Sequence, residues 1–392
     1  MTVPSRFGHT RAKPRMLFAA AAVATTAVAL AVPAAASAAT THTSPDGGAG
    51  PAVFVQTDNT AGNQVAAYAR ASDGTLTLAG TYPTGGLGGQ LTGSVVDHLA
   101  SQGSLQYDAA QHLLIAVNAG SNSLTVFGVH GTQLHRRQII GSGGEFPVSI
   151  AIRGNLVYAL NGLRGGSVQG YRLSPGGRLS FLRGSHRRLH LNQAATPQFT
   201  NTPGQVAFSP SGSQLIVTTK ANGNDIDVFG VQPGGRLSAS PVVNAEGSTV
   251  PFAIAFDQAG HLVIANAGNN ALATFALGSD GTVTPIDAVG TGQAATCWVT
   301  PAGGRLYASN AGSANVSGFT SNASGQLTLL GQTSTDPGTV DAAATPDGHF
   351  LYVQTGANGI VDEFSVGTGG ALTSVGSVTV AGAAGGEGIA AS

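Results

Sequence analysis

Cysteine is nearly absent from this sequence of 392 residues, since Cys297 is the only one. An intrachain disulfide is therefore impossible. A lone thiol within Thr-Cys-Trp-Val is most simply a small, buried apolar side chain. No histidine lies near it in the sequence, which argues against a catalytic cysteine.

Charged residues are also scarce, at 9% of the chain, whereas glycine is abundant at 58 residues. Beyond the N-terminal region, no stretch combines a sustained helical period of apolar residues with helix caps. Alanine and β-branched residues dominate instead. This composition is typical of many short strands joined by tight turns, so we expect almost no helix.

Familiar catalytic motifs are missing as well. There is no G-x-S-x-G nucleophile elbow, no H-E-x-x-H motif and no P-loop. His186 and His190 could share one face of a helix as metal ligands, but the adjacent Arg187 and Arg188 would repel a cation. We therefore predict no metal and no cofactor, and interpret this segment as a basic surface loop.

The N-terminus carries a targeting pattern. Four basic residues precede an apolar run at 16–32, no acidic residue occurs before Asp46, and Ala36-Ser37-Ala38 follows the run. This order predicts a secretory signal peptide at 1–38 and a disordered polar leader at 39–50. An uncleaved membrane anchor is the alternative. We expect a secreted, extracellular protein without stable membrane insertion.

The basic residues are unevenly distributed. Nine of them lie between Arg136 and Arg188, where Glu145 is the only acid. Either this segment is an ordinary solvated face, or it is an electrostatic footprint for an anionic partner such as an envelope polymer or a small substrate. Both interpretations remain open. No nucleic-acid partner is expected.

One pattern recurs seven times from residue 51 onward. In each copy a strand ends at a marker residue, an aromatic follows nine to eleven residues later, and a hairpin glycine comes after it. The markers are Thr57, Asn118, Asn161, Lys220, Asn266, Asn310 and Thr355. In the fifth copy the four strands are predicted at 250–256, 261–266, 271–277 and 282–289. Seven such units of about 45 residues predict an all-β, seven-bladed β-propeller spanning 51–392.

The two ends of the repeat array complement each other. The first copy lacks an inner strand, and residues 386–392 match the inner-strand pattern seen at 339–345. We predict that the C-terminal strand completes blade one and closes the ring. Two connections, at 84–102 and 184–202, exceed the regular period, and long insertions of this kind usually lie on the functional face.

Candidate site residues follow from propeller geometry, because blade connections and second-to-third strand turns gather at one mouth of the channel. The turns place Asn118, Asn161, Asn266, Asn310 and Lys220 there, and the inner strands begin with Ser104, Ser149, Gln205, Ala253, Thr296, Asp341 and Gly388. The asparagines could equally serve the turns themselves. Lys220 and Asp341, with Glu387 beside the ring, differ because a charge at a narrow mouth costs desolvation unless it is paired or used.

The repeats NAGSNSLTVF at 118–127 and FSPSGSQLIV at 208–217 resemble the lactonase-type seven-bladed propeller family. That family includes 6-phosphogluconolactonase and carboxy-cis,cis-muconate cyclase, and its repeats are shared with non-enzymatic YVTN-type propellers. Its enzymes tend to carry Arg-His before the fourth inner strand and Asn-Glu at the end of the next strand. Here these positions read Gly204-Gln205 and Thr219-Lys220.

Two functions follow. The resemblance implies a lactonase- or cyclase-like enzyme on a small anionic lactone or acid, with Lys220, Gln205 and the four asparagines binding substrate. Asp341 or Glu387 would then serve as the base. The replaced His, Arg and Glu favour the alternative, a non-catalytic scaffold that binds an envelope polymer, a polysaccharide or a protein. In either case we expect a monomer.

Overall fold

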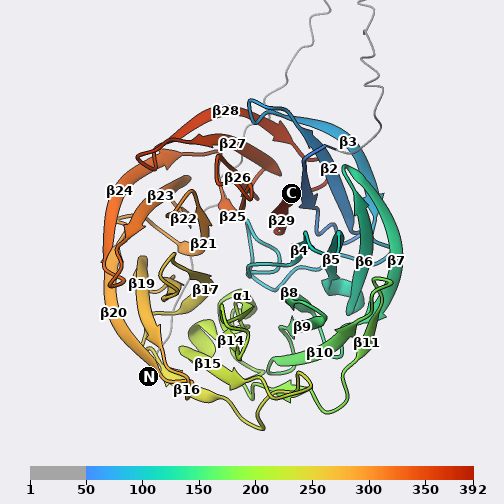
Figure 1. The fold of residues 1–392 in the computed structure, drawn as a ribbon, viewed down its shortest axis with the longest axis vertical. Helices are drawn as coiled ribbons and strands as arrows, with labels where there is room; N and C mark the ends of the chain where they lie inside the picture. The colour runs from blue at the N-terminus through green and yellow to red at the C-terminus, as the bar shows by residue number, and fades with distance from the viewer. Residues whose placement is uncertain (1–49) are drawn as a thin grey trace, which may run out of the picture. The chain divides into compact units, whose positions relative to one another are not determined.

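The structure, a computed structural model, describes residues 50–392. The predicted signal peptide and almost all of the leader lie outside these residues. Within them, seven antiparallel sheets are arranged in a ring around a central channel (Figure 1). The predicted all-β, seven-bladed propeller is confirmed.

The strands run from the channel outward in each blade. Blade 1 contains β29 (Ile389–Ala391), β1 (Ala52–Gln56), β2 (Gln64–Arg70) and β3 (Leu76–Pro83). Blade 2 contains β4 (Leu105–Asp108), β5 (Leu113–Asn118), β6 (Ser123–His130) and β7 (Gln133–Gly141). Blade 3 contains β8 (Pro147–Arg153), β9 (Leu156–Asn161), β10 (Ser167–Leu173) and β11 (Leu179–Phe181), with β12 (Arg187–Arg188) also paired to β10. Blade 4 contains β13 (Val206–Phe208), β14 (Gln214–Thr218), β15 (Asp225–Gly230) and β16 (Val242–Ala245).

The last three blades are the most regular. Blade 5 contains β17 (Pro251–Phe256), β18 (Leu262–Asn266), β19 (Ala271–Leu277) and β20 (Val283–Gly290). Blade 6 contains β21 (Thr296–Ala302), β22 (Arg305–Asn310), β23 (Asn315–Ser321) and β24 (Leu327–Ser334). Blade 7 contains β25 (Thr339–Ala344), β26 (Phe350–Thr355), β27 (Ile360–Val366) and β28 (Leu372–Thr379). Helical turns are limited to α1 (Gln198–Asn201), η1 (Ala119–Ser121) and η2 (Lys220–Asn222).

The ring closes as predicted. β29 pairs with β1 in antiparallel register, with Val55 opposite Ile389 and Val53 opposite Ala391. Both ends of the repeat array therefore share one sheet, and β29 covers the inner edge of β1 that would otherwise be unpaired.

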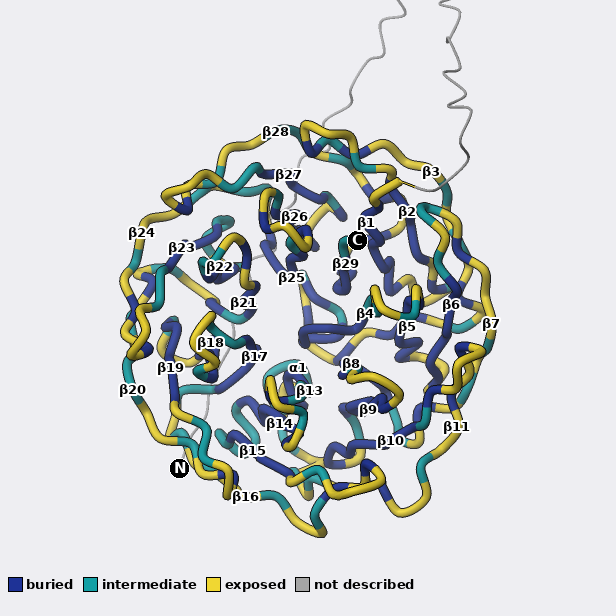
Figure 2. The backbone as a smooth tube through the Cα atoms, viewed as in Figure 1, coloured by how far each residue is buried: buried dark blue, intermediate teal, exposed yellow. Residues whose placement is uncertain are grey.

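Burial differs between the second and outermost strands of the blades, as Figure 2 shows. The second strands β5 and β9 are buried along their whole length, whereas the outermost strands β7 and β20 alternate or are largely exposed. A second strand has a neighbouring blade against each face, so its sequence is a continuous apolar run. An outer strand has solvent on one side, which explains its polar alternation.

The hairpin glycines of the repeat are explained by contacts between blades. The hydroxyls of Tyr158, Tyr307 and Tyr352 donate to the carbonyls of Gly235, Gly370 and Gly74 on the next blade, at 2.7, 2.9 and 2.8 Å. Gly74 has a φ of +92°, and a Cβ there would lie 2.3 Å from the Phe350 ring. A side chain at this position would separate two blades.

Strand register corrects the sequence alignment of blade 4. Phe127 pairs with Leu114, and Phe229 pairs with Leu215, so the residue equivalent to Asn118 is Thr219. Lys220 was therefore aligned one position too early. It begins η2 with a φ of +53° and is equivalent to Asp58 of blade 1, which has a φ of +50°. The cause is a longer turn between the second and third strands, with seven residues between the paired Thr218 and Ile226 against six between Val117 and Leu124 in blade 2.

A short turn corrects the ring of inner-strand residues in blade 6. Val299 pairs with Ala308 and Trp298 with Ser309, so Trp298 occupies the ring position that was predicted for Thr296. The cause is the turn between the first and second strands. It has two residues between the paired Ala302 and Arg305, against four between Asp108 and Leu113 in blade 2, and a fixed spacing in sequence does not reveal this difference.

Both long insertions lie where the period predicts them. The first connects β3 to β4 and crosses the middle of the ring, where its light-blue trace appears in Figure 1. The second connects β11 to β13 and contains β12 and α1. Residues 186–190 form no helix, so His186 and His190 do not share a helical face.

Candidate functional site

A segment of the first insertion, residues 97–104, closes the channel, and we call it the channel plug. It is bonded to blades on several sides of the ring. The Trp298 indole donates to the Ser101 carbonyl at 2.6 Å, and Gln102 exchanges two hydrogen bonds with the backbone of Val299 at 2.9 and 3.0 Å. The Ser101 hydroxyl donates to the Val148 carbonyl at 2.8 Å. These bonds fix the plug to blades 3 and 6.

Four carboxyl groups are buried beside the plug. They belong to Asp58, Asp97, Asp341 and Glu387, each at most 5% exposed. Glu387 accepts from the Gly103 amide at 2.9 Å and from the Ser101 hydroxyl at 3.2 Å. Asp97 accepts from the amides of Leu99, Ala100 and Ser101 at 2.8, 2.8 and 3.0 Å. The carboxyl groups therefore hold the plug in shape through its backbone.

Burial raises the pKa of all four groups. It raises the pKa of Asp58 to about 8, that of Asp97 to about 7 and that of Asp341 to about 6. Burial, together with the neighbouring carboxylates, also raises the pKa of Glu387 well above its usual value. The carboxyl groups of Glu387 and Asp341 share a hydrogen bond, which adds to the rise of the Glu387 pKa and opposes the rise of the Asp341 pKa.

Lys220 is the cation nearest to these acids. Its ammonium donates to the carbonyls of Ala100 and Phe199 at 2.6 and 2.7 Å and to the Thr202 hydroxyl at 3.1 Å. It also lies 5.1 Å from the centroid of the Phe252 ring. Burial lowers its pKa to about 7, and the charge of Asp97 opposes that shift. Lys220 thus joins the first insertion to the second with all three of its protons in use.

A pocket of about 180 Å³ opens at the same mouth of the channel, and we call it the mouth pocket. Its walls are largely apolar and include Val96, Phe199, Phe252, Cys297 and Trp298. Its polar side chains are Ser94, Asp97, Thr200 and Lys220. Burial raises the pKa of the Cys297 thiol to about 12, so this group is not an activated nucleophile at neutral pH.

The predicted site residues fall into separate environments. Lys220 lines the mouth pocket, whereas Asp341 and Glu387 lie beside the plug and are not part of its lining. Gln205 accepts from the Ile254 amide at 2.5 Å and is also outside the pocket. The four candidate residues therefore do not converge on a single cavity.

The asparagines mostly serve the blades that contain them. Asn118 donates to Thr125 at 2.9 Å, and Asn310 donates to Asn315 and Ser317 at 2.7 and 2.9 Å. Asn161 donates to the Ser142 carbonyl at 3.3 Å. The side-chain oxygen of Asn266 is buried without a hydrogen-bond partner in the described part of the chain. None of the four lines the mouth pocket.

Several residues of the mouth were not predicted from the sequence. Asp97 is the single acid of the first insertion and Trp298 is the single tryptophan of the chain, and both signals were available. Asp58 could not have been recognised, because its equivalence to Lys220 depends on the register of blade 4. Ser94, Phe199 and Phe252 carry no sequence signal for a pocket.

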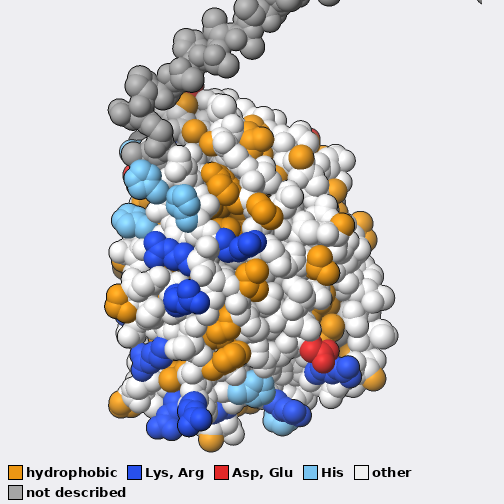
Figure 3. All heavy atoms as spheres, turned by 90° about the vertical axis from the view of Figure 1, so that its right-hand side faces the viewer, with side chains coloured by type: hydrophobic (Ala, Val, Ile, Leu, Met, Phe, Trp, Pro, Cys, Tyr) orange, Lys and Arg blue, Asp and Glu red, His pale blue; other side chains and the backbone are white. Residues whose placement is uncertain are grey.

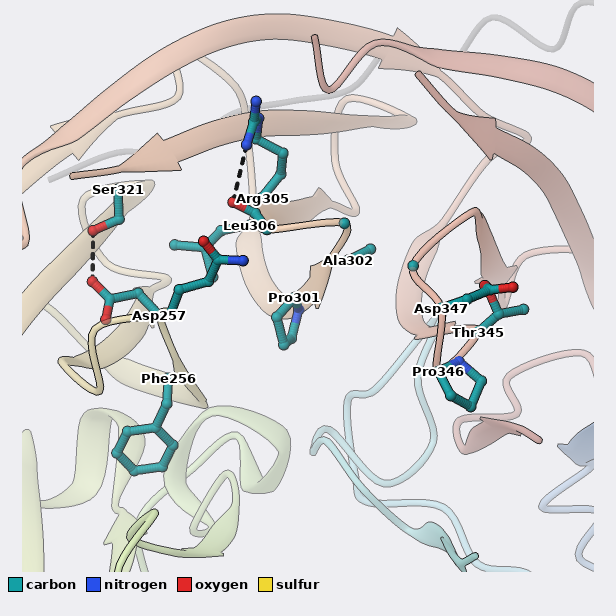
Figure 4. Close-up of a pocket in the computed structure, with 14 residues that line it drawn as sticks. Phe256, Asp257, Pro301, Ala302, Arg305, Leu306, Ser321, Thr345, Pro346 and Asp347 are labelled. Carbon is teal, nitrogen blue, oxygen red and sulfur yellow. Dashed lines mark hydrogen bonds between the residues drawn. The ribbon is translucent and has the colours of Figure 1, made fainter. Parts of the chain in front are cut away.

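A larger hollow, of about 420 Å³, lies at the other end of the strands (Figure 4). It is lined by first-to-second strand turns of blades 5, 6 and 7, including Asp257, Arg305 and Asp347. Asp257 accepts from Ser321 at 2.6 Å and contacts His261 at 2.8 Å. The carboxylate of Asp257 is thus engaged by two neighbours, and we place the candidate site at the mouth. No group of three or more His, Cys, Asp or Glu side chains in residues 50–392 is arranged to hold a metal ion.

The fold matches those of solved lactonase-type propellers. A 6-phosphogluconolactonase-like protein of Bacteroides fragilis matches with a TM-score of 0.68 and 17% identity, over 89% of this chain and 100% of its own. The periplasmic gluconolactonase of Pseudomonas aeruginosa matches with a TM-score of 0.69 and 17% identity, over 87% of this chain and 98% of its own. A protein of Lactobacillus plantarum matches with a TM-score of 0.69 and 19% identity, over 87% of this chain and 99% of its own.

No protein-family model matches the chain, and no curated protein matches it in sequence. The predicted resemblance to lactonase-type propellers is therefore confirmed at the level of the fold. At identities below 20%, the likeness carries no catalytic residue from one chain to another.

Proposed function

We propose that this chain is an extracytoplasmic propeller of lactonase-type fold that binds a small molecule in the mouth pocket. The observation that carries the proposal is the pocket itself, where two insertions and the inner strands of blades 5 and 6 meet around Lys220 and Asp97. A concave, largely apolar site with a few polar groups is the usual form of a ligand site. The signal peptide predicted at 1–38 supports the extracytoplasmic location.

Binding ranks ahead of catalysis because the charged groups are already occupied. Lys220 makes three hydrogen bonds to protein, Asp97 accepts three, and Asp341 and Glu387 are bonded to each other. A general base must reach the proton that it removes, and neither Asp341 nor Glu387 faces the pocket. This favours a non-catalytic function, with a small molecule in the pocket in place of the polymer, polysaccharide or protein that was predicted from sequence.

Lactone hydrolysis is the second candidate, and one observation favours it. Lys220 and Asp97 both line the pocket, and both have a pKa of about 7, where a group can donate or accept a proton at neutral pH. In this case Asp97, rather than Asp341 or Glu387, would be the base. The anionic lactone or acid predicted from the sequence is one substrate to test.

The test combines binding with turnover. Thermal shift would be measured on the purified chain with sugar lactones, muconates, simple lactones and phenols, for the unaltered chain and for Ala311→Phe, which fills the pocket. We expect shifts that Ala311→Phe abolishes and no hydrolysis in a pH-stat assay. Turnover that is lost in Asp97→Asn would establish the second candidate. Shifts that persist in Ala311→Phe, or none across the panel, would contradict a mouth-pocket site.

A separate partner is proposed for the outer surface. Arginine side chains cover the side of the molecule that carries β7 and β11, where acidic groups are scarce (Figure 3). We call residues 136–188 the basic rim. We propose that it contacts an anionic envelope polymer through long-range attraction, with the propeller acting as a monomer. No helix in residues 50–392 is long and apolar enough to cross a membrane.

A further inference from the structure

The size of the mouth pocket limits its ligand to one ring. Its volume is about 180 Å³, and an apolar cavity of about 150 Å³ takes a benzene molecule. Drug-sized ligands generally need about 300 Å³ or more. Phe252 and Trp298 pack edge to face with ring centroids 5.1 Å apart, so this wall is set by two buried aromatic rings.

The charged groups of the pocket already have partners within the protein, so they do not require a charged ligand. Lys220 and Asp97 both line the pocket, and the charge of each shifts the pKa of the other toward the ionised form, so that together they add no net charge when both are ionised. Each ammonium proton already has an oxygen acceptor, at 2.6 to 3.1 Å. An incoming phosphate or carboxylate would find no free cation and would have to lose its water against apolar walls.

One polar group of the lining is still unsatisfied. The hydroxyl of Ser94 has no hydrogen-bond partner in residues 50–392, although Ser94 is only 8% exposed. A buried hydroxyl without a partner costs free energy, and a ligand oxygen at hydrogen-bond distance would remove that cost. Ser94 is therefore the polar contact that the pocket can offer.

We propose that the mouth pocket selects a neutral, single-ring molecule with one hydrogen-bonding oxygen, such as an unsubstituted cyclic ketone or lactone. Its ring lies between Phe252, Trp298 and Val96, and its oxygen accepts from Ser94. Phosphorylated and polyhydroxylated sugar lactones are excluded, because each of their polar groups would be buried against carbon. This inference rests on the proposed function and adds the chemical class of the ligand.

The experiment compares three probes by calorimetry on the full purified chain. Cyclohexanone has the ring and the oxygen but cannot be hydrolysed. Glucono-δ-lactone adds hydroxyls, and 6-phosphogluconate is an open chain that carries a carboxylate and a phosphate. We expect cyclohexanone to bind at least tenfold more tightly than either comparator. Ser94→Ala should weaken it about fivefold, as expected for one neutral hydrogen bond, whereas the exposed Ser324→Ala should not.

Pocket-filling variants separate the possible failures. Ala311→Phe and Ala267→Leu, both in the lining, should abolish binding, and Ala323→Phe on an exposed turn of the same blade 6 should not. Using two fillings guards against one variant that fails to fold. If 6-phosphogluconate binds best and the fillings block it, the ligand class is wrong while the site stands. If no probe binds, or the fillings have no effect, the proposed function fails as well.

Discussion

The mouth of the channel and the basic rim contain charges of two very different kinds. The mouth holds Lys220 and four carboxyl groups, each at most 5% exposed and bonded to the backbone or to one another. The rim holds nine arginines and one acid, and most of these arginines are exposed. The rim is recognisable in the sequence because its charges are numerous. The mouth is recognisable only in the structure, because its charges are few and each is buried.

Blades 1 and 4 show how the mouth obtains its charges. Asp58 and Lys220 occupy the same turn position, one residue after the marker, in opposite halves of the ring. In the other five blades this position is a small residue, namely Ala119, Gly162, Ala267, Ala311 or Gly356. The two charged turns are therefore specific departures from the repeat, and both lie against the plug or its neighbours.

The rim arginines are themselves divided. Arg137 and Arg172 donate to carbonyls of the next blade, at Gly176 (3.0 Å) and Gly234. Arg164 pairs with Glu145 at 3.0 Å on an exposed surface. Arg188 and Arg183 are exposed and make no hydrogen bond to a side chain in the described residues. Some of the positive charge thus joins blades, and the remainder faces solvent.

The largest effect is expected from Lys220→Met. This change leaves Asp97 without its cation and the carbonyls of Ala100 and Phe199 without a donor. A buried carbonyl left without a donor costs about 1–3 kcal/mol, so the loss of both should lower the free energy of unfolding in urea by about 3–5 kcal/mol. Arg178→Ala, on the exposed rim, is the matched control and should change it by less than about 0.5 kcal/mol. A loss below about 1 kcal/mol for Lys220→Met would show that the mouth does not depend on this charge.

Stability should fall as the pH rises from 5 to 8. The carboxyl groups of Asp58, Asp97 and Asp341 keep their protons in the folded chain up to about pH 8, 7 and 6, whereas in the unfolded chain they lose them near pH 4. The unfolded chain therefore binds fewer protons across this window, and the stability present below pH 4 is lost through it. Lys220 makes stability rise with pH, but only above about pH 7, where it has lost its proton in the folded chain and still keeps it in the unfolded chain.

The measurement is the free energy of unfolding at pH 5 and at pH 8, with an expected decrease of at least about 3 kcal/mol. Asp58→Asn should flatten the upper part of the curve, because an amide does not titrate. The control Gln232→Ala, which alters an exposed side chain that does not titrate, should leave the curve unchanged. Equal stability at the two pH values would refute the raised pKa values.

Arg187 and Arg188 provide a smaller test within the rim. Arg187 donates to the carbonyls of Ser238 and Leu237 at 2.6 Å each, joining blade 3 to blade 4. Arg187→Ala should lower stability by about 1–3 kcal/mol, since hydrogen bonds from a charged donor are lost. Arg188→Ala should have almost no effect. Equal effects in thermal melts would mean that the rim is not divided in this way.

The smallest effect concerns binding by the rim. Retention of the chain on a dextran sulfate column should decrease with salt, because attraction between exposed charges is screened within about 10 Å at 0.1 M. Replacing the exposed Arg136, Arg178, Arg183 and Arg188 by alanine should lower the eluting salt concentration without changing the melting temperature. Unchanged retention would leave the basic rim with only its role between blades.

The repeat was predictable because each blade is encoded locally. The marker, the aromatic and the hairpin glycine recur at nearly fixed spacing, and each has a local cause in turn geometry or in the contact of neighbouring blades. Closure by residues 386–392 was predictable for the same reason. The displacements at Lys220 and Trp298 were not, because a longer turn in blade 4 and a shorter turn in blade 6 change the spacing without changing composition.

By itself, the sequence determined the number of blades, the closing strand and the positions of the two insertions, since these depend on short-range patterns repeated along the chain. Only the tertiary structure decided which charges meet. Asp58, Asp97 and Glu387 are brought together by ring closure, and Lys220 reaches Ala100 across 120 positions of the chain. Contacts of this range are set by the path of an irregular insertion through the channel. No local spacing encodes that path, so the mouth pocket and its residues appear only in the folded chain.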